Sequence, residues 1–193
     1  MITTLTVERR RFRMIIPAFP AFNIYSGVAD KMTALGPLYV ATAVNKMPGW
    51  DAEVIDENNL HGSAPRSTRG ADHDLIQQIR PAHVVGFYGG LTSTIPHLYH
   101  LAGKYKALGA VTVAGGQHFA GENIEEALSS GIDYLVLGEG EEAITELLSA
   151  ITGAIDISTV RSIAYRAHGR TVINERRPQL CSFDHLPLPD FSL

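Results

Sequence analysis

Short apolar runs alternate along the chain with longer segments in which apolar residues recur at helical spacing. Such short runs are typical of buried strands, and they occur at residues 13–16, 53–55, 83–88, 110–114 and 134–137. Helical patterns lie between and after these runs, at residues 35–47, 72–80, 98–108, 122–128 and 144–151. Strands that alternate with helices in this way predict an α/β fold, in which helices cover both faces of a five-stranded parallel sheet.

The pattern changes after Gly153. Residues 162–165 and 171–174 are two runs of β-prone residues on either side of a turn that contains Gly169, which predicts a β-hairpin. The tail that follows is punctuated by prolines and is typical of an extended linker. We therefore expect two parts, an α/β domain followed by a hairpin with a linker, at residues 1–153 and 154–193.

Composition narrows the class of protein. The 193 residues are 45% hydrophobic and 19% charged, with a formal net charge of −4. The hydrophobic fraction excludes a wholly disordered chain. The negative net charge means that the chain lacks the broad positive field that nucleic-acid-binding proteins use. No apolar run approaches the ~20 residues that cross a bilayer, so we expect a soluble, cytoplasmic protein. Cys181 is the single cysteine, which excludes an internal disulfide, a cysteine zinc site and a cysteine-ligated iron–sulfur cluster within this chain.

Glycines stand at the ends of three successive predicted strands. The carboxyl ends of parallel strands meet at one edge of a sheet, where open α/β sheets bind ligands. Glycine has no Cβ, so the backbone can approach a ligand closely there. A single glycine turn of this kind is better explained as an ordinary connection, but three in succession favour a ligand site. The glycines are Gly89, Gly90, Gly115, Gly116, Gly138 and Gly140.

Hydroxyl groups accompany the first of these glycine pairs. Thr92, Ser93 and Thr94 precede a predicted helix, and we expect one of them, Thr94 being suitable, to cap it. The remaining hydroxyls are then available to a polar ligand group or a phosphate. The first predicted strand runs into prolines and Phe19 instead of a G-x-G-x-x-G motif, and the sequence contains no P-loop motif. Dinucleotide and nucleoside-triphosphate sites of these two kinds are therefore disfavoured.

Charged loop residues offer further candidates. His118 follows a strand end, where a lone histidine is more often a polar loop residue than a ligand. Glu141 is explained by its place at the start of a helix, because carboxylates stabilise that end of the helix dipole. Glu139, between two glycines, is a candidate acceptor for a ligand hydrogen bond. Residues 56–59 with His61 could ligate a metal, but their spacing matches no standard site and a solvated loop fits better.

At these residues the sequence resembles the cobalamin-binding domains of B12-dependent radical S-adenosylmethionine (SAM) proteins. The family pattern is a strand, GGxH, a short helix, GxDxVxxGEGE and a second helix. Residues 113–118 (VAGGQH) and 131–141 (GIDYLVLGEGE) are similar to it. Residues 35–41 are similar to the family's first helix (PLGLxYLAA). Residues 80–86 with 92–94 resemble its central strand and Ser/Thr turn, and residues 183–190 resemble the link to its radical SAM domain.

The resemblance implies a flavodoxin-like sheet with the corrin ring of cobalamin over its carboxyl edge and the nucleotide tail in a groove. It implies no catalytic residue and no protein ligand to a metal within this chain. We expect His118 to contact the periphery of the cofactor or to order its own loop. We also expect Gly116→Val to reduce cobalamin retention while leaving the fold largely intact. The cofactor-binding residues that the resemblance implies are Thr92, Ser93, Thr94, Gly115, Gly116, Gln117, His118, Gly138, Glu139, Gly140 and Glu141.

Two motifs of related proteins are absent from the sequence. Without Cys-x-x-x-Cys-x-x-Cys, the iron–sulfur cluster and SAM would belong to a radical SAM domain elsewhere in the protein or in a partner chain. We therefore expect this chain alone to be catalytically silent toward SAM, and the tail from Leu186 to Leu193 to be mobile. Without Asp-x-His-x-x-Gly, we expect cobalamin to be bound with no histidine ligand, as is common in the radical SAM branch of the family.

The leading hypothesis is a cobalamin-binding module that serves a radical SAM enzyme, with methyl transfer as the reaction. A flavodoxin-like domain that binds FMN, or that works without a ligand in signalling or interaction, is the first alternative. A receiver domain would need clustered aspartates after the first strand, where this sequence has prolines and Phe19. A small enzyme such as a nucleotide-sugar transferase is the second alternative, but the sequence has no evident Asp-x-Asp for its metal.

Overall fold

A computed structural model describes residues 9–20, 31–60, 66–67, 70–178 and 186–193. Within these residues one sheet holds seven strands, in the order β2-β1-β5-β6-β7-β8-β9. Its strands are β1 (Arg10–Ile16), β2 (Trp50–Asp56), β5 (Val84–Tyr88), β6 (Val111–Gly115), β7 (Tyr134–Val136), β8 (Ile163–Ala167) and β9 (Arg170–Ile173). A separate two-stranded ribbon consists of β3 (Arg66–Ser67) and β4 (Gly70–Ala71). His61, Cys181 and residues 183–185 of the expected linker lie outside the described residues.

The first five strands of this sheet are parallel, as the hydrophobic pattern predicts. Strands β1 and β2 begin three residues earlier than predicted, because arginines in β1 and acidic residues in β2 interrupt the apolar pattern. Their register places Arg11 opposite Asp51 and Arg13 opposite Glu53, and each of these pairs forms a salt bridge. Opposite charges on neighbouring strands stabilise the pairing, so polar residues extend both strands beyond their apolar runs.

The C-terminal hairpin is part of the same sheet. Strand β8 pairs antiparallel with β7, and β9 pairs antiparallel with β8. His168 and Gly169 connect the two strands, both with positive φ, as a two-residue hairpin turn requires. The predicted five-stranded sheet therefore has seven strands. The reason is that β7 would otherwise leave a row of backbone N–H and C=O groups unpaired at the sheet edge.

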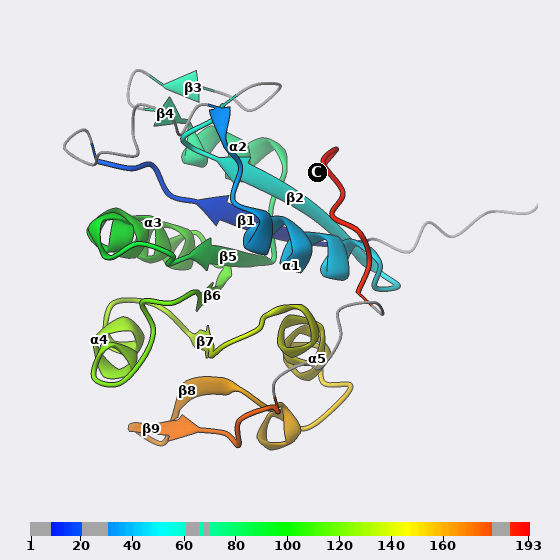
Figure 1. Ribbon diagram of the computed structural model, residues 1–193, viewed down its shortest axis with the longest axis vertical. Coiled ribbons are helices and arrows are strands. Elements are labelled where there is room, and N and C mark those ends of the chain that lie inside the picture. The colour runs from blue at the N-terminus through cyan, green and yellow to red at the C-terminus, as the bar shows by residue number, and fades with distance from the viewer. Residues whose placement is uncertain (1–8, 21–30, 61–65, 68–69, 179–185) are drawn as a thin grey trace, which may run out of the picture.

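Helices cover both faces of the sheet and divide the core in two (Figure 1). One core lies between the sheet and helices α1 and α5, and it contains Phe12, Val113 and Leu147. The other lies under α2, α3 and α4 and contains Ile15 and Leu98. Successive residues of a strand point to opposite faces, which is why neighbours on β1 enter different cores. The helices are α1 (Leu35–Asn45), α2 (His73–Ile79), α3 (Ile95–Ala107), α4 (Asn123–Ser129) and α5 (Glu141–Ile151).

The start of α3 differs from the expected cap. A short 3₁₀ turn, η3 (Thr92–Thr94), precedes the helix. Thr94 occupies the cap position, but its hydroxyl donates to the Leu91 carbonyl at 2.8 Å and makes no capping bond to α3. The hydroxyl therefore stabilises the turn that leads into the helix. None of the described helices is long and apolar enough to span a membrane.

The end of the chain, residues 186–193, lies along α1 and β2 (Figure 1). The backbone N–H of Asp190 donates to Thr42 Oγ1 at 2.9 Å, and Leu193 packs against the core under α1. Leu188 and Phe191 are exposed. We expected this segment to be mobile, but in the structure it packs against α1 through these contacts.

Candidate functional site

The glycines at the strand ends gather at one edge of the sheet. Tyr88 of β5 pairs with Gly115 of β6, and Gly115 pairs with Val136 of β7, so the turns that follow these strands are neighbours. The Gly89 N–H also donates to the Gly115 carbonyl at 2.7 Å, which continues the ladder beyond β5. The three glycine-bearing turns therefore form one continuous rim at the carboxyl edge.

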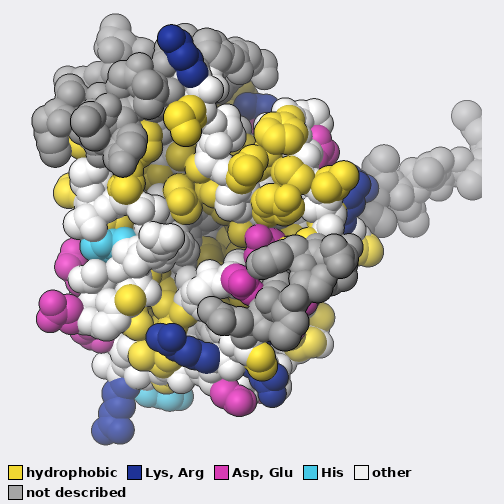
Figure 2. Space-filling model, viewed as in Figure 1, with side chains coloured by type: hydrophobic (Ala, Val, Ile, Leu, Met, Phe, Trp, Pro, Cys, Tyr) yellow, Lys and Arg dark blue, Asp and Glu magenta, His cyan; other side chains and the backbone are white. Residues whose placement is uncertain are grey.

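A cavity of about 200 Å³ opens from this rim between the sheet and helices α1 and α5. Hydrophobic side chains gather on this face of the molecule over α1 and in the recess beside it (Figure 2). Gly86 lies in the middle of β5 on the cavity floor, and a Cβ there would stand 2.7 Å from Phe12 Cζ. The remaining lining is mostly apolar, including Phe12, Met14, Pro37, Val40, Val113, Val136 and Ile144. The cavity is suited to a flat apolar group.

The glycines of the rim have different physical roles. Gly115 has ordinary backbone geometry, and a Cβ there would meet only Val136, at 3.5–3.6 Å. Gly116 has a φ of +125°, and a Cβ there would lie 2.6 Å from the Gly89 carbonyl oxygen. The two turns touch backbone to backbone at this point, so Gly116 is required by the fold. Gly116→Val is therefore expected to distort the fold, in contrast to the expectation from the sequence.

A second cavity, of about 290 Å³, opens at the carboxyl ends of β1, β2 and β5. It is lined by Ile16, Pro17, Phe19, Met32, Thr33, Ala34, Asp56, Asn58, Tyr88, Gly90, Leu91 and Thr94. Tyr88 also lines the first cavity, so the two cavities share this residue. We refer to the cavity beside α1 and α5 as cavity A and to this one as cavity B.

The eleven residues expected at the site fall into three groups. Those in the lining of cavity A are Gly115, Gly116, Gly138, Glu139, Gly140 and Glu141. Thr94 lines cavity B. Thr92, Ser93, Gln117 and His118 lie outside both linings, in the turns that follow β5 and β6. Thus six of the eleven expected residues meet at a single cavity.

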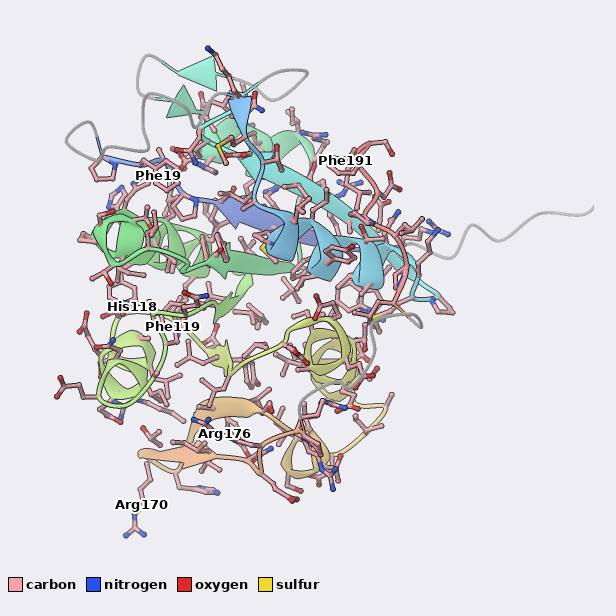
Figure 3. All side chains as sticks on the ribbon, viewed as in Figure 1. Phe19, His118, Phe119, Arg170, Arg176 and Phe191 are labelled. Carbon is pink, nitrogen blue, oxygen red and sulfur yellow. The ribbon has the colours of Figure 1, made fainter. Side chains whose placement is uncertain are left out.

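His118 joins three segments of the chain. Its ring Nδ1 lies 3.3 Å from Thr92 Oγ1, its backbone N–H donates to the Gly89 carbonyl, and its carbonyl accepts from Asn123 Nδ2. Its Nε2 is buried without a hydrogen-bond partner among the described residues. His118 and Phe119 lie together between α3 and α4 (Figure 3). In this arrangement His118 orders its own loop.

Glu57 is buried among partners that the sequence did not predict. The sequence suggested a solvated loop at residues 56–59, but the Glu57 side chain is only 5% exposed. His73 Nε2 lies 3.0 Å from its Oε1, and His97 Nε2 lies 2.7 Å from its Oε2. The Ala18 N–H also donates to Oε2, at 3.0 Å. These hydrogen bonds tie β1, β2, α2 and α3 together at Glu57. The described residues contain no group of three or more His, Cys, Asp or Glu side chains arranged to hold a metal ion.

The Glu57–His97 pair affects the ionisation of both groups. Burial acts to raise the pKa of Glu57, but the hydrogen bonds from His73 and His97 outweigh it and lower the pKa from 4.5 to about 2. The hydrogen bond to Glu57 raises the pKa of His97 above 6.5, against the opposing effect of burial. Each group is therefore held in its charged form by the other.

This pair predicts a bell-shaped pH dependence of stability. Glu57 stabilises the fold above pH 4.5, and this contribution is lost as the pH falls toward 2. His97 stabilises it below pH 6.5, and this contribution is lost as the pH rises through its raised pKa. We expect Glu57→Gln to lower the free energy of unfolding by about 2–3 kcal/mol between these limits and by less on either side. Urea denaturation at pH 3, 5.5 and 8.5 measures the free energy of unfolding of the wild type and of Glu57→Gln, with Glu122→Gln at an exposed position as the control. A difference between wild type and Glu57→Gln that is the same at all three pH values would contradict the prediction.

Comparison with known proteins identifies the family. The model of the B12 binding domain matches residues 26–148. No curated protein gave a significant match. Among solved structures, the cobalamin-dependent SAM radical enzyme OxsB with aqua-cobalamin bound has a TM-score of 0.71 and 12% identity over 95% of this chain. The radical SAM methyltransferase TsrM from Kitasatospora setae, with cobalamin and a 4Fe–4S cluster bound, has a TM-score of 0.63 and 18% identity over 94% of this chain.

These two structures are much longer than the chain described here, which spans 24% of OxsB and 31% of TsrM. At such low identity the likeness shows the shared fold alone. The match to the family model is broader evidence, because it includes α1, four of the five parallel strands (β2, β5, β6 and β7) and the glycine rim. This chain belongs to the family of B12-binding domains.

Proposed function

We propose that this chain holds cobalamin at the carboxyl edge of its sheet, with the nucleotide base of the cofactor in cavity A. The observation that carries the proposal is the cavity itself, which is apolar, opens at the glycine rim and lies between α1 and α5. Gly115 leaves free the space that a side chain would occupy at its mouth. A planar aromatic base gains from burial against these apolar walls without needing a charged partner.

The residues of the chain hold and orient the cofactor in this proposal. Phe12, Val113 and Val136 of the sheet and Ile144 of α5 line the cavity and would contact the base. Glu139 and Glu141 stand at the mouth, where carboxylates accept hydrogen bonds from donors on the ligand. When bound, cobalamin supplies a cobalt centre suited to carrying a methyl group. The module would therefore serve a radical SAM domain, in the same protein or in a partner chain, in a methyl-transfer reaction.

Reconstitution with hydroxocobalamin tests this function. We expect the purified chain to retain about one equivalent after desalting, measured by visible absorption, and to retain no FMN in a parallel sample. Retention of FMN without cobalamin would favour the flavodoxin-like alternative. Retention of neither would overturn the proposal.

His118 is not expected to ligate the cobalt. Its Nδ1 faces Thr92, its Nε2 is buried, and its ring lies outside both cavities. We therefore expect His118→Ala to leave the visible spectrum of bound cobalamin nearly unchanged, with affinity changed by about twofold through its loop. Absorption spectra of the two reconstituted proteins measure this. A shift that marks the loss of nitrogen coordination would show that the imidazole is an axial ligand.

A further inference from the structure

Cavity B adjoins the proposed nucleotide site and is the larger of the two cavities. The two meet at Tyr88, whose ring occupies the space that a side chain at Gly90 would need: a Cβ on that glycine would lie 2.3 Å from Tyr88 Cζ. A cobalamin whose base fills cavity A has its macrocycle outside that cavity. Cavity B is the neighbouring cavity at the same edge of the sheet, so its lining is available to contact the corrin ring.

The walls of cavity B suit the rim of a corrin. Phe19, Met32 and Leu91 present apolar atoms, and Met32 is 65% exposed. The polar side chains in the lining are Thr33, Asp56, Asn58, Tyr88 and Thr94. A corrin ring is flat, is covered with methyl groups and carries primary amides around its edge. Apolar walls with one carboxylate match that combination, because the carboxylate accepts hydrogen bonds from amide N–H groups.

The position of Asp56 is fixed by its neighbours. Its Oδ1 accepts from the Asn58 N–H at 3.0 Å and from Asn58 Nδ2 at 3.1 Å. Asn58 in turn donates to the Pro17 carbonyl at 3.1 Å and accepts from the Phe19 N–H at 2.7 Å. The end of β2 and the turn after β1 are thereby tied together. Asp56 is thus held rigidly where it meets the cavity, and little side-chain entropy is lost when a ligand binds.

We propose that Asp56 is a specificity-determining residue that selects corrinoids with amide side chains over corrinoids with free carboxylates. This inference rests on the proposed cobalamin function and adds a residue to its site. An amide of the ring donates an N–H to the half-buried Asp56 carboxylate. A carboxylate at the same place would repel it, and the repulsion is strong because few water molecules can screen it.

Two ring compounds without the nucleotide base isolate this effect from cavity A. Cobinamide carries amides around the ring, and cobyrinic acid carries carboxylates. We expect the wild-type chain to bind cobinamide more tightly, and Asp56→Asn to reduce the ratio of the two dissociation constants by about tenfold. Isothermal titration calorimetry measures both constants. Asp74→Asn, an exposed aspartate on α2, is the matched control and is expected to leave the ratio unchanged.

Asp56→Glu keeps the charge and is expected to retain the preference for amides, which separates selectivity from a general loss of folding. Thermal unfolding of each variant gives the independent measure of the fold. An unchanged ratio in Asp56→Asn, with hydroxocobalamin still bound, would overturn this inference and leave the proposed function in place. If the wild-type chain binds none of the three corrinoids, both the inference and the proposed function are overturned.

Discussion

Replacing Gly115 by leucine is expected to weaken cobalamin binding about 70-fold. The side chain would project from β6 into the mouth of cavity A, on the same face of the strand as Val113. If it displaces about 100 Å² of apolar contact with the nucleotide base, the loss is about 2.5 kcal/mol, which corresponds to that change in the dissociation constant. Gly115 tolerates a side chain because its nearest neighbour, Val136, would lie at an ordinary contact distance.

Two controls make this prediction specific. Gly103→Ala, on the exposed side of α3, meets nothing within 4 Å and is expected to leave cobalamin binding unchanged. Cobinamide, which lacks the base, should bind wild-type and Gly115→Leu proteins equally. Titration calorimetry with both ligands measures these constants. Equal affinity of the two proteins for cobalamin would place the base outside cavity A.

Replacing Arg13 by methionine is expected to lower the free energy of unfolding by about 3–5 kcal/mol. The Arg13 side chain is fully buried, and Nε donates to Glu53 Oε1 at 2.8 Å. Its other nitrogens donate to Gln77, Tyr105 and the Arg80 carbonyl. The substitution removes one donor from each of these groups. Glu53 keeps Arg80 and Gln77 keeps the Ala82 N–H, so the loss of the buried Arg13 hydrogen bonds is the physical source of the effect.

Urea denaturation of Arg13→Met and of Arg11→Met measures this effect on one strand. Arg11 pairs with Asp51 in a part-exposed salt bridge, so its loss is expected to cost about 1 kcal/mol or less. A loss for Arg13→Met as small as that for Arg11→Met would show that the buried network contributes little.

Much of the candidate site follows from local sequence. Parallel strands bring their carboxyl ends to one edge, so the glycines after β5, β6 and β7 had to be neighbours once the strands were recognised. That reasoning is sufficient to place Gly115, Gly138 and Glu139 together. It does not distinguish a glycine that leaves room for a ligand from one that leaves room for another loop. Gly115 and Gly116 are adjacent in sequence and differ in this way, because only Gly116 touches the backbone of the turn after β5.

The residues that sequence analysis missed are those with distant partners. Glu57 meets His97, 40 residues along the chain, and Arg13 meets Tyr105, 92 residues along the chain. No periodicity or short motif records such pairs. One signal was present: arginines within an otherwise apolar strand, followed by acidic residues in the next strand. In parallel strands in register, these charges face each other, as Arg13 and Glu53 do.

The sequence by itself determined the class of fold, the alternation of strands and helices, and the edge of the sheet at which the glycine-bearing turns gather. These depend on the spacing of apolar residues and on glycine, which act over a few residues. The tertiary structure alone decided that the hairpin continues the sheet, that cavity B lies beside cavity A, and that Glu57 is buried between two histidines. Each of these depends on which backbone or polar groups meet when distant segments pack together. A buried group that finds no partner costs free energy, and the partners are brought together only in the folded chain.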